Sequence, residues 1–148
     1  MYLNDIESVT NSIFGYVIAN DVTAQNIHNR DHHLAYSKSR KTFCPISQYI
    51  TTDINPNSLN LRTWINGNLT QNSSSNKQIL NAVESVYFIN QHIPISKGDL
   101  IITGTPAGYE LNQIKPGDIV KMEIEKLGTL SNIVIEKDRK STRLNSSH

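Results

Sequence analysis

Residues 59–71 read LNLRTWINGNLTQ, and this stretch decides the fold class. Apolar and polar side chains alternate over residues 59–65, which is the period of a strand with one buried face. Asn66 and Gly67 follow, a pair that tolerates the left-handed backbone of a two-residue hairpin turn. Residues 69–71 then predict the returning strand. The stretch therefore indicates an antiparallel hairpin.

The residues before this hairpin predict a short helix and a buried strand. Residues 5–13 carry apolar side chains at the spacing of a short amphipathic helix. The apolar run at residues 14–19 is typical of a buried strand, which we expect over residues 16–22. A polar stretch with several histidines follows and predicts a helical turn and a loop, before a second apolar run at residues 43–50.

The residues after the hairpin predict one main helix and further strands. Serine and asparagine at residues 72–76 are suitable helix caps, and Ile79, Val83 and Val86 have helical spacing. Three later apolar segments predict strands, two of them after Gly-Asp turns: residues 100–102, 119–124 and 130–135. Because strands outnumber helices and hairpin turns dominate, the sequence predicts an α+β fold of mostly antiparallel β-sheet.

The composition excludes several classes of protein. Of the 148 residues 37% are apolar and 18% charged, with 14 Lys and Arg against 13 Asp and Glu. This balance predicts no nucleic-acid or membrane partner. Cys44 is the single cysteine and suits a reducing compartment, and no apolar run is long enough to span a bilayer. We expect a cytoplasmic domain.

The last residues, 138–148, read DRKSTRLNSSH and lack apolar periodicity. They are similar to one translated reading frame of a common sequencing adapter. We therefore expect residues 138–148 to be a non-native tail and residues 1–137 to form one domain.

Three places along the chain are candidates for chemistry. Asp21 ends an apolar run, where a carboxylate is either a metal ligand or a turn cap. Lys38 lies among polar neighbours and is either catalytic or a solvated surface lysine. Residues 103–108 read TGTPAG, which forms either an anion-binding loop with outward amides or a plain tight turn. His28, His32 and His33 lack zinc-ligand spacing and favour loop histidines.

Five segments in order resemble the fumarylacetoacetate hydrolase family. They are GYVIANDVTA at residues 15–24, Lys38-Ser39 followed by FCPI at 43–46, RTWING at 62–67, GDLIITGTPAG at 98–108, and KPGDIV at 115–120 with the closing strands. The resemblance covers residues 14–134. It implies the β-roll or sandwich of the family's C-terminal catalytic domain, with one main helix packed on it.

The resemblance also implies roles for particular residues. Asp21 would bind Mg²⁺ or Mn²⁺ together with an upstream Glu-x-Glu pair, which suits a hard cation that prefers oxygen ligands. Lys38 would stabilise an enolate, and Thr105 with the amides around Gly104 would hold a substrate carboxylate. Gln25 and His28 would occupy substrate-binding positions.

The sequence departs from the family pattern at several of these positions. An Arg-Asp pair is replaced by Gln25 and Asn26, a glutamine by His28, and a Phe-Asp pair by Arg40 and Lys41. The upstream Glu-x-Glu ligands and the pair that activates water have no counterpart at the start of the chain, so we expect truncation on the N-terminal side.

Two functions of different classes follow. The first is a divalent-metal-dependent hydrolase, lyase or isomerase of a small dicarbonyl or 2-oxo acid, homodimeric in the full-length protein. The second is a catalytically incompetent fragment or a non-enzymatic β-rich binding domain.

Overall fold

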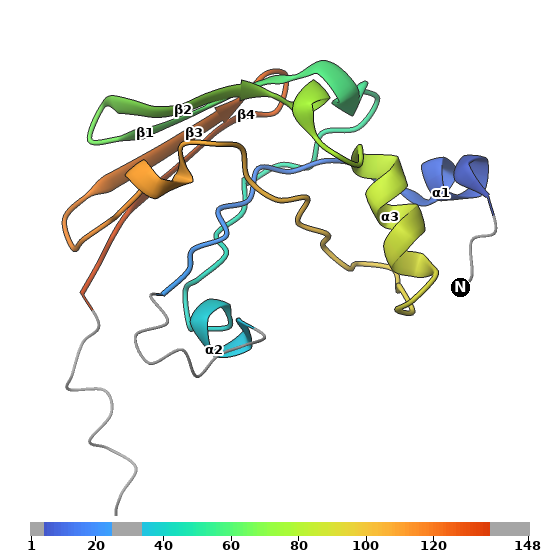
Figure 1. The fold of residues 1–148 in the computed structure, drawn as a ribbon, viewed down its shortest axis with the longest axis horizontal. Helices are drawn as coiled ribbons and strands as arrows, with labels where there is room; N and C mark the ends of the chain where they lie inside the picture. The colour runs from blue at the N-terminus through green and yellow to red at the C-terminus, as the bar shows by residue number, and fades with distance from the viewer. Residues whose placement is uncertain (1–4, 25–33, 137–148) are drawn as a thin grey trace, which may run out of the picture.

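A computed structural model describes residues 5–24 and 34–136 (Figure 1). Its centre is an antiparallel sheet in the order β2-β1-β3-β4. The strands are β1 (Asn60–Ile65), β2 (Asn68–Ser74), β3 (Ile119–Ile124) and β4 (Gly128–Ile133). The expected antiparallel α+β fold is confirmed, as are the strands predicted around the hairpin and at residues 119–124.

The hairpin turn is fastened to the start of β3. Asn66 and Gly67 have φ angles of 50° and 81°, the left-handed values that a primed two-residue turn requires. The Asn66 side chain donates to Asp118 Oδ1 over 2.9 Å and accepts from the Ile119 amide over 2.8 Å. The two hydrogen bonds from Asn66 and from the Lys115 amide lower the pKa of Asp118 below its ordinary value.

The two faces of the sheet differ in burial. Four side chains are buried on the inner face: Thr63, Gln71, Val120 and Leu130. The outer face instead carries charged residues, with Arg62 3.7 Å from Glu123 and the Lys121 ammonium 5.1 Å from the centre of the Trp64 ring. This alternation is the one that the sequence pattern predicts.

A bulge in β2 brings that strand against residues 103–108. Thr63 pairs with Gln71 and Trp64 with Leu69, so Thr70 is an extra residue. A Cβ on Gly108 would lie only 2.5 Å from the Thr70 carbonyl oxygen, and Gly108 has a φ of 95°. Glycine at this position therefore allows the loop to approach the bulged strand.

Two helices form a second layer at one end of the molecule (Figure 1). Helix α1 (Ile6–Ser12) packs on α3 (Ala82–Asn90), and Val9 of α1 has no exposed surface. Asn81 and Glu84 form a capping box at the start of α3. The caps predicted at residues 72–76 do not begin the main helix, because these residues end β2 and Ser74 caps η2 (Ser75–Lys77) instead. The Ile79 side chain, placed on the helix by its spacing, precedes α3 and is fully exposed.

Two predicted strands are absent from the described part of the chain. Residues 16–22 are extended but form only the single bridges Tyr16–Thr51 and Ala19–Ile46. Residues 100–102 are irregular, because no described strand lies beside them to accept their amides. Phe14, expected in a buried strand, is 78% exposed, whereas Ile18 is fully buried.

Three short helices complete the described elements: α2 (Ala35–Lys38), η1 (Pro56–Ser58) and η3 (Tyr109–Leu111). Within the described ranges, no helix is long and apolar enough to cross a membrane. Residues 138–148, expected to be a non-native tail, lie outside the described residues.

Replacing Asp118 tests the turn that joins β1, β2 and β3. The lowered pKa of Asp118 means that its contribution to stability is present above the unfolded-state value of about 3.8 and is lost as pH falls through the folded-state value. We expect Asp118→Asn to lower the urea midpoint at about pH 7, and the difference from wild type to shrink at about pH 3. An equal difference at both values of pH would contradict this account.

Two glycines of one loop provide a matched pair for testing the contact between the loop and β2. Gly104 and Gly108 have φ angles of 91° and 95°, but a Cβ on Gly104 would meet no atom within 4 Å. Either alanine variant should lose about 1 kcal/mol through left-handed backbone strain. Gly108→Ala should lose about 1–3 kcal/mol more, because the Thr70 carbonyl must move. Urea unfolding measures the difference, and equal losses would exclude the close contact.

Candidate active site

Two extended segments, far apart in the sequence, place Asp21. The Tyr16 and Thr51 amides each donate to the other residue's carbonyl oxygen, the Ser47 amide donates to the Ile18 carbonyl, and the Asn20 amide donates to the Pro45 carbonyl. Gly15 permits this approach, because a Cβ there would lie 2.6 Å from the side chain of Ile50. Asp21 follows directly where the paired region ends.

Helix α2 places Lys38 opposite Asp21. The Ala24 amide donates to the Ser37 carbonyl over 2.9 Å, which ties the chain after Asp21 to α2. Ser37 is buried, so the helix is anchored on this side. The Lys38 ammonium forms an ion pair and hydrogen bond with Oδ2 of Asp21, and both side chains are about one third exposed (35% and 36%). The structure thus joins two of the three central candidates.

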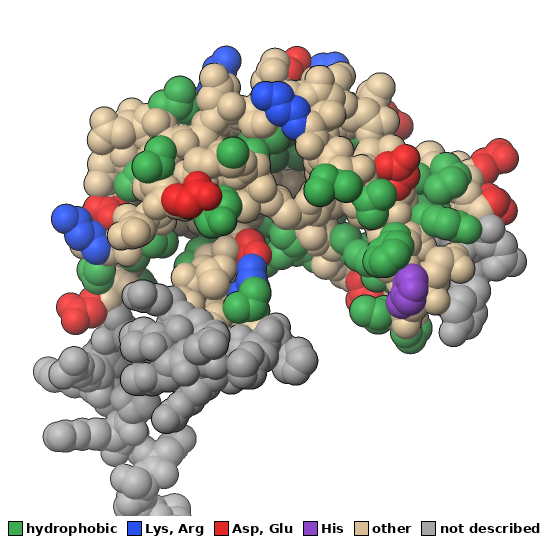
Figure 2. Space-filling model, in the orientation of Figure 1, with side chains coloured by type: hydrophobic (Ala, Val, Ile, Leu, Met, Phe, Trp, Pro, Cys, Tyr) green, Lys and Arg blue, Asp and Glu red, His purple; other side chains and the backbone are tan. Residues whose placement is uncertain are grey.

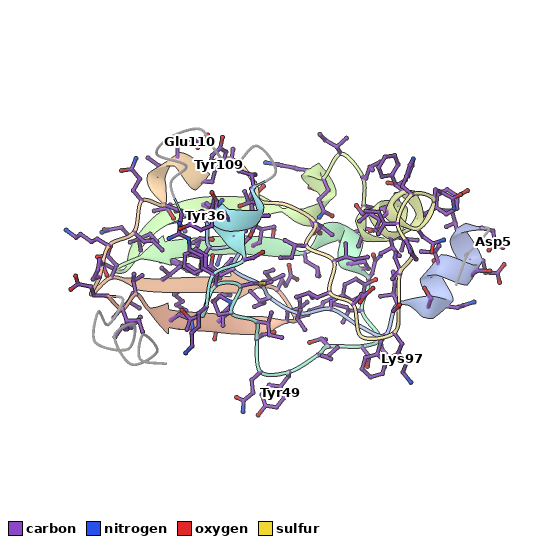
Figure 3. The ribbon with its side chains drawn as sticks, turned by 90° about the horizontal axis from the view of Figure 1, so that it is seen from below. Asp5, Tyr36, Tyr49, Lys97, Tyr109 and Glu110 are labelled. Carbon is purple, nitrogen blue, oxygen red and sulfur yellow. The ribbon has the colours of Figure 1, made fainter. Side chains whose placement is uncertain are left out.

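The segment after Lys38 carries two more cationic side chains. Arg40 and Lys41 follow Lys38 within three positions and are exposed. Arg40 does not compete for Asp21 among the described contacts, since its Nε donates to the Tyr36 carbonyl and its guanidinium lies 4.7 Å from the centre of the Tyr36 ring. Figure 3 shows Tyr36 on α2, in front of the sheet when the molecule is seen from below, with Tyr49 far from it.

Thr105 is held by a different set of contacts. The Gln71 side-chain amide donates to Thr105 Oγ1 and to the Pro106 carbonyl oxygen, each over 3.0 Å. Asn112 in turn donates to Gln71 Oε1 over 3.0 Å. The backbone amides of residues 101–105 have no hydrogen-bond acceptor in the part of the chain that the structure describes. Such a loop can offer several N–H donors to an anion.

The candidates therefore divide into two groups. Asp21 and Lys38 are in contact, whereas Thr105 forms no hydrogen bond with either of them among the described residues. Gly104 lies in the same loop as Thr105 with open space around it. Gln25 and His28, expected at the substrate, lie outside the described residues.

Sequence reasoning missed Gln71, Gln78 and Asn112, the side chains that contact the loop. Gln78 donates to Thr103 Oγ1 over 3.0 Å. The signal for Gln71 is its position opposite Thr63 on the inner face, where a polar side chain is buried only if it is hydrogen-bonded. The other two offer no comparable signal in the sequence.

The described side chains offer few ligands for a divalent cation. A carboxylate oxygen of Asp21 has the right chemistry for Mg²⁺ or Mn²⁺, but one carboxylate is too few for such an ion. Among residues 5–24 and 34–136, no group of three or more His, Cys, Asp or Glu side chains is arranged to hold a metal. These residues alone therefore do not complete a metal site.

A separate hollow of about 140 Å³ lies on the outer face of the sheet, lined by Asn60, Arg62, Glu123 and Glu125. None of the candidate residues lines it. Its charges already pair with one another, through Arg62 and Glu123, and Asn60 donates to Glu125. The hollow is thus not part of the candidate site.

Comparison with known proteins identifies the family. The model of the fumarylacetoacetate (FAA) hydrolase C-terminal domain matches residues 3–135. An uncharacterised protein of Methanocaldococcus jannaschii is 40% identical over 126 residues, covering 85% of this chain and 52% of the relative. A mitochondrial oxaloacetate tautomerase of Xenopus laevis is 30% identical, covering 87% of this chain and 44% of that protein.

Solved structures agree in fold. A 2-hydroxyhepta-2,4-diene-1,7-dioate isomerase of Mycobacterium marinum has a TM-score of 0.80 at 38% identity, covering 90% of this chain and 52% of that chain. A fumarylacetoacetate hydrolase of Exiguobacterium antarcticum has a TM-score of 0.84 at 30% identity, covering 90% and 50%.

A third solved structure, the maleylpyruvate hydrolase of a Sphingobium species in complex with manganese(II) and pyruvate, has a TM-score of 0.75 at 25% identity. The match covers 88% of this chain and 47% of that chain.

The chain spans about half the length of the curated relatives it matches. Its sequence and its fold both place it, over residues 3–135, in the fumarylacetoacetate hydrolase family.

Proposed function

We propose that the protein acts on a small 2-oxo acid, or on the enol form of one, and that Lys38 stabilises an enolate during the reaction. The substrates named for the relatives support this choice, since oxaloacetate, the heptadienedioate and maleylpyruvate each contain a 2-oxo acid or its enol. Tautomerisation, isomerisation and hydrolysis of such compounds all place negative charge on the oxygen next to the carboxylate. One cation beside that oxygen would serve all three reactions.

The observation that carries the proposal is the contact between Lys38 and Asp21. An ammonium group has three N–H donors, and the ion pair with Asp21 Oδ2 uses one of them. The remaining donors have no acceptor among the described residues, and the Lys38 side chain is 35% exposed, so they could bind an oxygen of the substrate. Asp21 thereby holds the ammonium in place and leaves it able to bind a second anion.

A carboxylate of the substrate would be bound by the loop that contains Thr105. The hydroxyl of Thr105 and the amides of residues 101–105, which have no described acceptor, are donors of the kind that an anion needs. In this proposal Lys38 and the loop bind the two ends of one 2-oxo acid group. Gln25 and His28 would contact the rest of the substrate.

A divalent cation, Mg²⁺ or Mn²⁺, forms part of this proposal, with Asp21 as one ligand. The support is the related maleylpyruvate hydrolase, which was solved with manganese(II) and pyruvate. Such an ion would supply Lewis-acid polarisation of the 2-oxo acid. The described residues provide only part of the ligand set that such an ion needs. We also propose, from the family resemblance, that the full-length protein is a homodimer.

A second candidate is a binding module without catalytic activity. The observation that favours it is that Asp21 is the one carboxylate found at the site within the described ranges. A chain with one carboxylate ligand should bind Mg²⁺ weakly. Calorimetric titration of this chain with magnesium chloride should show no binding in the micromolar range, and a micromolar dissociation constant would contradict the ligand count given above.

Replacing Lys38 tests the enzymatic proposal. Lys38→Met removes the cation, whereas the control Lys38→Arg keeps a cation at this position. With oxaloacetate as substrate, followed by the ultraviolet absorbance of its enol, Lys38→Met should lower kcat about a hundred-fold or more and change KM little. Lys38→Arg should lose less.

The outcomes separate the two candidates. A Lys38→Met protein with the wild-type kcat would exclude the proposed role of Lys38. A folded wild type that turns over neither oxaloacetate nor the other two named substrates would favour the binding module. Urea unfolding of each variant controls for a loss of folded protein.

A further inference from the structure

The side-chain amide of Gln71 has only one orientation compatible with its neighbours. It is 3% exposed and touches Thr105 Oγ1, the Pro106 carbonyl oxygen and the Asn112 amide. A carbonyl oxygen can only accept, so the group that faces Pro106 must be the NH₂ of Gln71. Turning the amide by 180° would place Gln71 Oε1 against the Pro106 oxygen at about the same distance. The Pro106 carbonyl therefore decides which atom faces Thr105.

This orientation determines where the hydroxyl proton of Thr105 points. Because the Gln71 NH₂ donates to Thr105 Oγ1, the hydroxyl is an acceptor on that side, and its own proton must point elsewhere. Thr105 is exposed, and the structure shows no acceptor for this proton among the described residues. The hydroxyl is thus an oriented donor directed away from β2.

A second glutamine–threonine contact in the same loop lacks this constraint. Gln78 donates to Thr103 Oγ1, but its amide has no further described partner. Its oxygen and nitrogen could therefore exchange places, and Thr103 could either donate or accept. The two contacts have the same chemistry and length and differ in whether a third group fixes their direction.

We propose that Gln71, locked by Pro106 and Asn112, is a positioning residue that turns the Thr105 hydroxyl into a hydrogen-bond donor for a carboxylate oxygen of the ligand. The inference rests on the proposed function, since that supplies the carboxylate. It goes further because Gln71, a residue of β2 outside the loop, would determine whether the Thr105 hydroxyl donates to the ligand. The alternative is that Gln71 only fastens the loop to β2.

A double-mutant cycle on pyruvate binding separates these roles. Sodium pyruvate is titrated calorimetrically into the chain with magnesium chloride present, so no turnover is needed. Thr105→Val should weaken binding about five-fold, as expected for one hydrogen bond of ordinary strength, and Gln71→Met should weaken it similarly. The double variant should bind as weakly as Thr105→Val alone, because Gln71 acts through the hydroxyl.

Gln78→Met is the matched control, because it removes a glutamine tether from the same loop without changing Thr105. It should leave pyruvate affinity unchanged. If Gln71→Met unfolds too readily for titration, Gln71→Glu keeps the size of the side chain and its acceptor for Asn112. The carboxyl oxygen that replaces the Gln71 nitrogen would donate its own proton to the Pro106 carbonyl and accept a hydrogen bond from the Thr105 hydroxyl, so pyruvate should again bind more weakly.

Several results would overturn the inference. Additive losses in the double variant, or an equal loss in Gln78→Met, would mean that the glutamines only hold the loop. Unchanged affinity in Thr105→Val, or no pyruvate binding by the wild type, would show that the hydroxyl is not a donor to the ligand. None of these results affects the Lys38 experiment, whose readout is turnover.

Discussion

The candidate site depends on the pairing of residues 16–20 with residues 45–51. These segments exchange hydrogen bonds at Tyr16 and Thr51 and again between Ile18 and Ser47. Together with the hydrogen bond from the Ala24 amide to the Ser37 carbonyl, this pairing holds Asp21 beside Lys38. The close approach depends in turn on Gly15, since any side chain there would collide with the neighbouring segment. The backbone pairing of these two segments thus positions Asp21 for its ion pair with Lys38.

The chemistry of the site divides between a cationic side and a neutral donor side. The cationic side is the ion pair between Asp21 and Lys38 of α2, whose ammonium bonds to no other acceptor in the part of the chain that the structure describes. The neutral side is the loop at residues 101–106, fastened to the bulged strand β2 through Gln71. Figure 2 shows apolar side chains gathered over the lobe of α1 and α3, at the opposite end of the molecule from the turn between β1 and β2. The helical layer therefore supports the fold and contributes none of the candidate residues.

Local chemistry made part of this structure predictable. The alternation at residues 59–65 and the turn at Asn66-Gly67 depend on neighbours in sequence, and the hairpin was predicted correctly. The strand expected at residues 16–22 failed, because its partner segment contains Pro45, which has no amide to donate, and bonds the Ile18 amide through a serine side chain. For Asp21 and Lys38 the residues alone left a cap and a surface lysine open, and only the family resemblance brought them together. The role of Gln71 depends on Pro106, 35 residues away, and no local pattern contains it.

The most direct measurement of the central claim is a crystal structure of the protein with oxalate, a planar dianion that mimics the enolate of a 2-oxo acid. We expect one oxalate oxygen within hydrogen-bond distance of Lys38 Nζ, with Asp21 still in contact with the ammonium. A carboxylate oxygen at the other end should lie within hydrogen-bond distance of Thr105 Oγ1. Oxalate bound away from Lys38, or bound to Lys38 with Thr105 out of reach, would contradict it.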